Sequence, residues 1–264
     1  MDFGLIDKKA IIPASSRGLG KACAWSLAKE GVKIFLNGVS EKSLEKTVKE
    51  FTQAGFIVDF VLGKIEDEDT RKGLLEKCPD PDILINNSGG PPPGNFYDWT
   101  ESDFIDAFKS NFLSSTLFMQ DVIPGMKERK FGRIVNITSA MVKNPNILLG
   151  LSTSARSGLH GISKALSRDV AKHNITINNV LPERIDTDRQ TQIIEMQSKL
   201  MKVSFEEAKD SMEKQLSAGR MGTVEEFASI VCFLCSEQAS YISGQNISVD
   251  GGNSSSLFLS LIHI

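Results

Sequence analysis

The sequence predicts a single α/β domain with a doubly wound parallel sheet, and three observations support this fold class. Short apolar runs alternate with segments of helical period along almost the whole chain of 264 residues. A turn rich in small residues, at positions 13–20, joins the first apolar run to the first helical segment. Polar residues follow directly after several of the runs, at the edge where such a sheet binds its ligands.

Seven short apolar runs predict the strands of that sheet. In chain order they cover residues 10–12, 32–37, 56–62, 82–86, 133–137, 175–181 and 247–249. Strands that alternate with helices are joined by right-handed crossovers, which place helices on both faces of a parallel sheet. No internal repeat, linker or change in composition divides the chain, so we expect one domain.

Helical segments lie between several of these runs, and each presents an apolar stripe. The stripes of the first two consist of Leu19, Cys23 and Leu27, and of Leu44, Val48 and Phe51. A long periodic segment, residues 101–126, follows Thr100, which is a favourable N-cap residue. Another, from about residue 153 to 173, presents Ala155, Leu159, Ile162, Leu166 and Val170.

The composition argues against nucleic acid and membranes as main partners. The formal net charge is −3, whereas nucleic acid and anionic lipid select basic surfaces. No apolar run approaches the roughly 20 residues of a membrane span, and the first residues lack the apolar core of a signal peptide. A short basic cluster includes Glu128 and therefore indicates a solvated loop; its members are Lys127, Arg129, Lys130 and Arg133.

The four cysteines show no pattern of a disulfide framework, which fits a reducing cytoplasm. Cys232 and Cys235 form a C-x-x-C pair, but they lie in an apolar helical stretch without a second pair or nearby histidines. Core packing therefore explains them better than redox chemistry or a metal site, and we predict no metal.

The small-residue turn is the first candidate for a binding site. Gly18 and Gly20 lie between a strand and a helix, where missing side chains let phosphate groups approach the N–H groups at the positive end of the helix. A tight strand-to-helix connection with no ligand is the alternative, because turns of this composition are common.

Several motifs, taken together and in order, resemble the short-chain dehydrogenase/reductase family. The resemblance covers residues from about 5 to 252. Its motifs are the turn 13–20, the stretch 86–89, Asn111, the strand 133–139, the segment 178–187 and the late signatures 219–222 and 250–252. The family's role for the stretch 86–89 is to stabilise the sheet, and its role for the segment 178–187 is to cover the nicotinamide.

The resemblance implies a Rossmann-type fold over residues 1–252, with a substrate lid at about 188–218 and an apolar tail at 253–264. It also implies an enzyme that transfers hydride between a nicotinamide cofactor and a carbonyl or hydroxyl substrate. By general pattern the chain is most similar to 3-oxoacyl-acyl-carrier-protein reductases, which makes a 3-oxoacyl thioester one candidate substrate. The cofactor residues carried over from the family are Ser15, Ser16, Arg17, Gly18, Leu19, Gly20, Gly38, Ser40, Lys64, Ile65, Asn87, Ser88, Gly89, Arg156, Pro182, Ile185 and Thr187.

The catalytic residues depart from the family pattern. Asn111 and Ser139 match it, but Ser152 stands where the family has its catalytic tyrosine and Arg156 where it has its lysine. The spacing of four is kept, so both side chains share one face of a helix. A serine hydroxyl cannot replace a phenol as proton donor unaided, and an arginine effectively never gives up its proton.

Two functions follow from this substitution, and both stay open. The first is an oxidoreductase with a modified proton relay, in which water, or Tyr97 from the loop after the fourth strand, supplies the proton. The second is a protein of the same fold that binds the nucleotide, or catalyses a non-redox step, without ordinary carbonyl reduction. The retained Asn111 and Ser139 favour the first, and the missing tyrosine favours the second.

Two further positions depart from the family. The first turn begins Pro13-Ala14 where Thr-Gly is usual, and we expect Ala14 to hold an ordinary backbone conformation in a slightly different turn. Lys64 takes the place of the aspartate that holds the adenine.

We predict NADP(H) rather than NAD(H) as cofactor. The family's NAD-binding members carry an acidic residue after the second strand, and residues 37–40 contain none. Arg17 stands where a basic residue pairs with the 2′-phosphate, and Ser40 and Lys42 add possible contacts. A solvated role for Arg17 is the alternative.

The resemblance also implies a homo-oligomer, a tetramer or a dimer, paired through the helices that begin near Glu101 and Thr153. Six apolar residues near the carboxyl terminus support an interface independently; they are Leu257, Phe258, Leu259, Leu261, Ile262 and Ile264. The alternative is that this tail is a cloning remnant.

Overall fold

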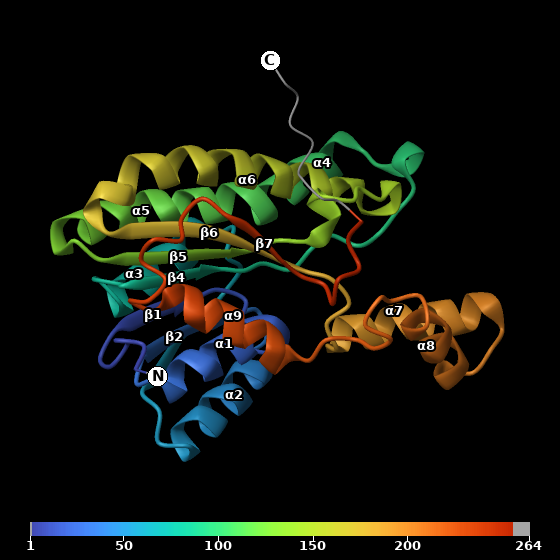
Figure 1. The fold of residues 1–264 in the computed structure, drawn as a ribbon, viewed down its shortest axis with the longest axis horizontal. Coiled ribbons are helices and arrows are strands. Elements are labelled where there is room, and N and C mark those ends of the chain that lie inside the picture. The colour runs from blue at the N-terminus through green and yellow to red at the C-terminus, as the bar shows by residue number, and fades with distance from the viewer. Residues whose placement is uncertain (1, 256–264) are drawn as a thin grey trace.

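The computed structural model describes residues 2–255, so the predicted apolar tail lies almost entirely outside the described residues. Seven parallel strands form one sheet in the order β3-β2-β1-β4-β5-β6-β7 (Figure 1). The strands are β1 Lys9–Ile12, β2 Lys33–Gly38, β3 Val58–Leu62, β4 Ile83–Asn86, β5 Gly132–Ile137, β6 Ile175–Pro182 and β7 Asn246–Val249. The predicted seven-stranded doubly wound sheet is thereby confirmed.

Helices connect the strands, and the last connection, between β6 and β7, contains three of them. They are α1 Gly18–Lys29, α2 Glu41–Gln53, α3 Glu68–Lys77, α4 Glu101–Phe108, α5 Ser114–Arg129, α6 Gly150–Val170, α7 Asp188–Met201, α8 Phe205–Glu213 and α9 Val224–Cys235. The sequence analysis assigned no helix to α3, because its charged sequence buries only Leu74 among its large apolar residues. Within residues 2–255, no helix is both long and apolar enough to cross a membrane.

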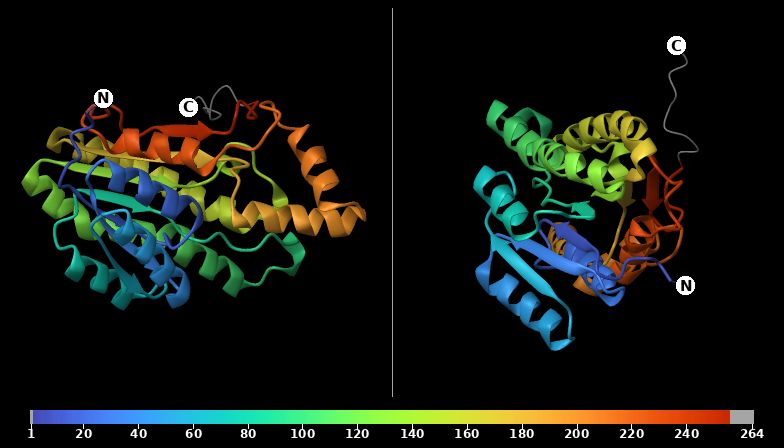
Figure 2. Two further views of the ribbon diagram at one scale, coloured as in Figure 1. Left: turned by 90° about the horizontal axis from the view of Figure 1, so that it is seen from below. Right: turned by 90° about the vertical axis from the view of Figure 1, so that its left-hand side faces the viewer.

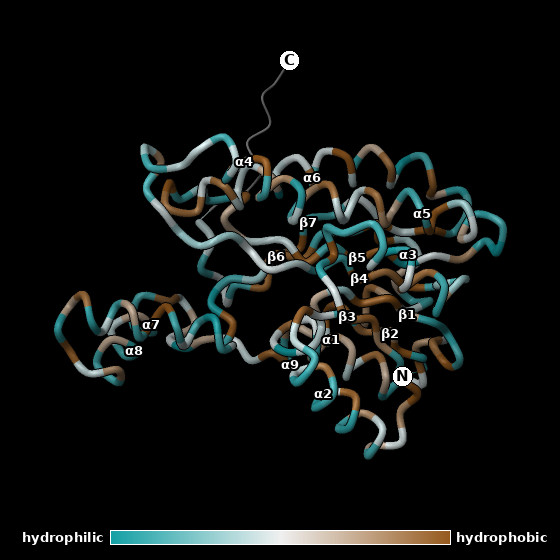
Figure 3. Tube along the Cα trace, turned by 180° about the vertical axis from the view of Figure 1, so that it is seen from behind, coloured by the Kyte–Doolittle hydropathy of each residue, from teal (hydrophilic) through white to brown (hydrophobic). Residues whose placement is uncertain are grey.

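The helices form a layer on each side of the sheet (Figure 2). Helices α1, α2 and α9 pack on one face and α3, α5 and α6 on the other. Side chains alternate between the two cores along each strand, so Ala10 and Ile12 belong to the first and Ile11 to the second. Figure 3 shows the hydrophobic residues concentrated along the central strands. Cys232 and Cys235 are buried in the first core, which confirms the packing role predicted for them.

The predicted helix over residues 101–126 is two helices joined by one π-helical turn, Lys109–Leu113. Thr100 forms the expected N-cap, as part of a capping box with Asp103. The π-turn contains Asn111 and buries its side chain. Such turns widen a helix locally and are frequent at functional sites.

Helices α7 and α8 project from the body of the molecule (Figure 1). They enclose a small core of their own around Ile194 and Met221. Ala208 and Met212 are buried in this core, and Phe205 and Leu216 are partly buried against it. This pair of helices occupies the residues predicted to form the substrate lid.

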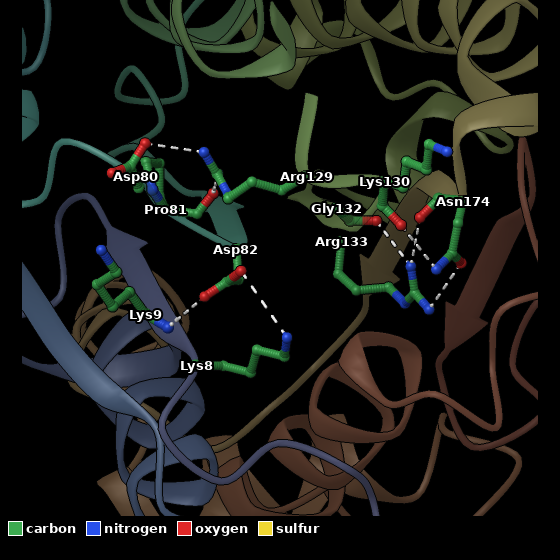
Figure 4. Close-up of polar contacts among 10 residues, drawn as sticks. All are labelled: Lys8, Lys9, Asp80, Pro81, Asp82, Arg129, Lys130, Gly132, Arg133 and Asn174. Atoms are coloured by element: carbon green, nitrogen blue, oxygen red, sulfur yellow. Dashed lines mark hydrogen bonds and ion pairs between the residues drawn. The ribbon is translucent and has the colours of Figure 1, made fainter. Parts of the chain in front are cut away.

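The basic cluster does not form a solvated loop as predicted. Arg133 is 1% exposed, and its side chain donates to the carbonyl oxygens of Gly132 and Asn174 (Figure 4). It also donates to the carbonyl oxygen of Ser236. Its guanidinium also stacks on the ring of Phe131, 4.4 Å from the centroid. Arg133 is the second residue of the fully buried strand β5, and the carbonyls of Asn174 and Ser236, which lie at helix C-termini, satisfy its charge. It therefore stabilises the amino-terminal edge of the sheet, away from the candidate site.

Candidate functional site

The candidate site lies where the strand order reverses. The chain runs from β1 outward to β2 and β3 and then returns to β4 on the other side of β1. Ligands of such sheets bind in the crevice outside the carboxyl ends of the strands at this point. The turn after β1 and the stretch Asn87 to Gly89 after β4 therefore meet at one place, and Asn87 Nδ2 donates to the carbonyl oxygen of Ala14 over 3.0 Å.

Ala14 departs from the expectation of an ordinary backbone conformation. Its φ is +47°, in the left-handed region that favours glycine. The amide of Ala14 donates to Asn37 Oδ1 over 3.2 Å, and its carbonyl accepts from Asn87. These two side chains hold the strained residue in place, so the turn keeps its shape without the glycine that is usual in the family.

The start of α1 fits a bound phosphate group. Arg17 precedes the helix in an extended conformation and provides no side-chain cap, and the first turn contains no acidic residue. The first N–H groups therefore keep their hydrogen-bonding capacity for an anion. Gly18 has φ +58°, and a Cβ there would meet no atom within 4 Å. A Cβ on Gly20 would lie 2.8 Å from the carbonyl oxygen of Ala14, so this glycine allows the turn to close on the helix.

The other residues predicted for the adenosine side differ in exposure. Ser15 is fully buried and its hydroxyl donates to the carbonyl of Ile12, so it supports the turn from within. A Cβ on Gly38 would lie 3.0 Å from Ser16 Oγ. Ser40 caps α2 by accepting from the amide of Ser43. Leu19 is partly buried against the first core, Lys64 is exposed and Ile65 is buried.

Asn111 joins the π-turn to the loop after β4. Its Nδ2 donates to the carbonyl oxygen of Gly89 over 3.2 Å and to Ser110 Oγ over 2.7 Å. Its Oδ1 is buried and has no hydrogen-bond partner within the described residues. An orphaned buried acceptor of this kind indicates a water or ligand donor at this place. Ser88, between the two anchored residues, is partly buried.

A row of asparagines runs across four strands beneath the site. Asn86 Nδ2 donates to Asn136 Oδ1 over 2.8 Å, Asn136 Nδ2 to Asn179 Oδ1 over 2.8 Å, and Asn179 Nδ2 to Asn246 Oδ1 over 2.7 Å. Asn136 also donates to Ser163 on α6 over 2.9 Å. These hydrogen bonds join the four strands to one another and β5 to α6. The row was not predicted, although Asn86 and Asn136 stand near the carboxyl ends of their strands.

Ser152 and Arg156, the residues predicted to replace the family's tyrosine and lysine, lie on one face of α6. Arg156 Nη1 donates to Ser152 Oγ over 2.8 Å. Burial, together with the positive charge of Arg189, lowers the pKa of Arg156 from 12.5 to about 10, so the guanidinium stays charged at neutral pH. Ser152 is buried.

His160, one turn beyond Arg156, ties this helix to the end of β5. Its Nε2 lies 2.9 Å from Thr138 Oγ1, next to Ser139 in the chain. Burial, with smaller contributions from Arg156 and Lys143, lowers the pKa of His160 to about 4. His160 is therefore neutral at physiological pH and positions the helix rather than donating a proton. The sequence analysis missed it, and its spacing of four from Arg156 was the available signal.

Ser139 and Tyr97 occupy different environments. Ser139 follows β5 directly and its hydroxyl accepts from the amide of Met141 over 3.2 Å. The ring of Tyr97 is 88% exposed and stacks edge-on against Phe96. Ser139 is next in the chain to Thr138, which contacts His160 on the helix of Ser152 and Arg156, whereas the side chain of Tyr97 faces solvent.

The segment after β6 closes the site from the other side. Pro182 ends β6, and Ile185 pairs with Gly222 in an isolated bridge. Thr187 caps α7. The next two residues contact the opposite side of the site. Asp188 Oδ2 lies 3.9 Å from Arg17 Nη1. Arg189 donates to the carbonyl oxygens of Gly90 and Pro91.

The arrangement can bind a dinucleotide and polarise a carbonyl group. The turn and α1 fit the phosphates, Arg156 offers N–H donors to ribose hydroxyls, and Ser139 and Ser152 offer hydroxyl groups to a substrate oxygen. Within residues 2–255, no group of three or more histidine, cysteine or acidic side chains is arranged to hold a metal.

Known proteins with the same sequence features are reductases. A sequence profile described as enoyl-(acyl carrier protein) reductase matches residues 13–254. The NADPH-dependent reductase BacG of Bacillus subtilis (strain 168) is 32% identical over 95% of this chain and 99% of its own length. The 3-oxoacyl-(acyl-carrier-protein) reductase FabG of Aquifex aeolicus (strain VF5) is 31% identical over 96% of this chain and 99% of its own.

The fold is also that of solved reductases. The crystal structure of L-sorbose reductase from Gluconobacter frateurii, complexed with NADPH and L-sorbose, is similar with a TM-score of 0.92. The identity is 26%, and the match covers 97% of this chain and 100% of that one. The chain therefore belongs to the short-chain dehydrogenase/reductase family and is one of its NAD(P)H-dependent reductases.

Proposed function

We propose that this protein uses NADP(H) to transfer hydride to and from a carbonyl or hydroxyl substrate through a modified proton relay. The observation that carries the proposal is the hydrogen bond from Arg156 to Ser152, at the positions of the family's lysine and tyrosine. NADPH supplies the hydride. Ser139 and Ser152 hold the substrate oxygen, and the charge of Arg156 stabilises the negative charge that develops there. The proton comes from water, because neither hydroxyl is acidic enough to deliver it unaided.

The preference for NADP(H) rests on charge around the adenosine side. Arg17 is exposed beside the start of α1, with only a 3.9 Å approach to Asp188, and residues 37–40 contain no acid that would repel a 2′-phosphate. Ser40 is the N-cap residue of α2, and Lys42 lies in the first turn of that helix. BacG is named as NADPH-dependent, and L-sorbose reductase was solved with NADPH. These relatives support the same preference here.

The substrate is a small molecule or an acyl thioester. FabG, named as a 3-oxoacyl-(acyl-carrier-protein) reductase, supports the thioester. Incubation with NADPH and a panel of ketones, 3-oxoacyl thioesters and sugars tests the function, with oxidation of NADPH as the expected result. Binding without oxidation would favour the alternative, a nucleotide-binding or non-redox protein of this fold, to which the missing tyrosine points.

A double variant tests the modified relay directly. Ser152→Tyr with Arg156→Lys restores the family's residue types at both positions. Ile147 and Leu148, which could have filled the space of a phenol ring, are 66% and 52% exposed. A positioned acid accelerates proton transfer on the order of 10²–10⁴-fold, so we expect the double variant to be faster than the wild type. An equally slow or slower double variant, still folded and still binding NADPH, would contradict the proposed relay.

We also propose a cytoplasmic homo-oligomer. All four cysteines are free and buried, which supports a reducing compartment. Ile105, Phe108 and Leu113, at α4 and the π-turn, are large apolar residues that stay 37–45% exposed, as expected of a subunit interface. Light scattering at micromolar concentration should show a tetramer or a dimer, and a monomer would refute the oligomer.

A further inference from the structure

Two arginines at the candidate site have no acidic partner. Arg156 makes its hydrogen bond to a neutral hydroxyl, that of Ser152. Arg189 donates only to backbone carbonyls, over 3.3 Å to Gly90 and 3.2 Å to Pro91. Within residues 2–255, no carboxylate lies at ion-pair distance from either guanidinium, although other arginines of the same region, such as Arg220, are paired.

The two positive charges lie close enough to affect one another. Part of the lowering of the Arg156 pKa comes from the charge of Arg189, and the rest from burial. Lys143, whose Nζ donates to Ser248 Oγ over 2.9 Å, adds positive charge near His160 on the same helix. Arg156 is partly buried and Arg189 is exposed, so an anion that binds between them would relieve the repulsion between the two charges.

The position of Arg189 in its helix is a second reason to expect a bound anion. It stands in the first turn of α7, where the helix dipole disfavours a cation and favours an acid. Its neighbour Asp188 is the residue that suits this place, and its carboxylate approaches Arg17 rather than Arg189. Arg189 is therefore unfavourable for the helix and lies near the positive charge of Arg156, which indicates that it binds an anion.

An apolar rim lies next to this charged pair. The amide of Gly94 donates to the carbonyl of Leu148 over 2.9 Å, so the loop after β4 contacts the segment that leads into α6. Phe96, Ile147 and Leu148 are 49–66% exposed. The ring of Trp99 lies against Gly150, at the start of the helix that carries Ser152. Arg189 donates to Gly90 and Pro91 at the start of the same loop, so a ligand that it binds can extend along the loop toward these exposed apolar side chains.

We propose that Arg189, with the charge of Arg156 behind it, binds a carboxylate on the substrate, so that the preferred substrates are oxo acids with an apolar body. This inference rests on the proposed function. The reaction moves hydride from NADPH to the carbonyl carbon, the π electrons of the C=O bond go to oxygen, and water supplies the proton. The products are a hydroxy acid, NADP⁺ and hydroxide, and the carboxylate itself does not react.

The experiment compares an acid with its ester. The full-length protein saturated with NADP⁺ is titrated calorimetrically with 2-oxooctanoate and with ethyl 2-oxooctanoate, and NADPH oxidation is measured with the same pair. A charge-assisted bidentate contact is worth about a ten- to hundredfold difference, so the acid should bind and react at least about tenfold better than the ester. Equal binding of the two, or binding of neither, would overturn the proposal.

Variants of α7 assign the selectivity to Arg189. Arg189→Met should remove the preference for the acid. Arg189→Lys should retain part of it, because lysine keeps the positive charge but lacks the paired N–H donors of a guanidinium group. Lys199→Met is the matched control, since it removes one exposed positive charge from the same helix and should leave the acid-to-ester ratio unchanged. If Arg189→Met weakens NADPH binding and leaves the ratio intact, the anion is a cofactor phosphate and the proposal is wrong.

The outcomes separate this proposal from the function on which it rests. Reduction of simple ketones or 3-oxoacyl thioesters without any preference for acids would leave the reductase function standing and remove the carboxylate site. Selective binding of the acid without oxidation of NADPH by any carbonyl compound would do the opposite.

Discussion

Arg156 Nη1 donates a 2.8 Å hydrogen bond to Ser152 Oγ, one turn away on α6. If Arg156 holds the nicotinamide ribose, Arg156→Ala removes a charged donor and should weaken NADPH binding at least about tenfold. Ser152→Ala removes a hydroxyl that is proposed to contact the substrate and not the cofactor, so NADPH binding should stay nearly unchanged. Fluorescence titration with NADPH measures both, and equal losses in the two variants would contradict the separate roles.

Arg17 should decide the choice between the two cofactors. Its side chain is exposed, and its 3.9 Å approach to Asp188 is too weak and too solvated to fix it. Arg17→Ala should therefore lower the affinity for NADPH about tenfold or more and leave that for NADH almost unchanged. Lys29→Ala, at the other end of α1, is the control for loss of a positive charge. Tighter binding of NADH than NADPH by the wild type would refute the preference.

His160 should make the fold sensitive to mild acid. Burial is the main cause that lowers its pKa from 6.5 to about 4. The unfolded chain takes up a proton below about pH 6.5, whereas the folded chain does so only near pH 4, so the free energy of unfolding should fall by up to about 3 kcal/mol across that window. His160→Gln keeps a hydrogen-bonding side chain near Thr138 and should remove this loss. Urea unfolding at about pH 7 and about pH 4.5 measures it, and identical losses in both proteins would count against the buried neutral histidine.

Gly20 should tolerate no side chain. A Cβ there would lie 2.8 Å from the carbonyl oxygen of Ala14 and 2.9 Å from Ser15 Cα, both backbone atoms that cannot easily move. Gly20→Ala should therefore destabilise the fold by about 1–3 kcal/mol and weaken cofactor binding with it. Gly161→Ala is the control, because Gly161 is exposed on α6 and a Cβ there would have no atom within 4 Å. That variant should gain about 0.5–1 kcal/mol from helix propensity.

The sequence predicted the features that depend on local pattern. Apolar runs bounded by turns marked all seven strands, and Thr100 marked the start of α4, because both signals lie within a few residues. The inward face of α6 followed from helical spacing in the same way.

Features that depend on contacts distant in sequence were missed or predicted wrongly. The positive φ of Ala14 is held by Asn37 and Asn87, which local reasoning about glycine could not include. Arg133 looked like part of a basic loop, and only the fold brings the carbonyls of Asn174 and Ser236 to it. For the site, motif resemblance gave residue positions, but the unpaired state of Arg189 became visible only in three dimensions.

Hydride transfer is the central claim, and isotope labelling tests it most directly. NADPH carrying deuterium at the transferring position of C4 is incubated with the protein and the panel of ketones, oxo acids, 3-oxoacyl thioesters and sugars, and the products are analysed by mass spectrometry. The account predicts an alcohol that carries one deuterium on its carbinol carbon, at a slow rate that rises in the Ser152→Tyr, Arg156→Lys double variant. Tight binding of NADPH with no deuterium in any product, by either protein, would contradict it.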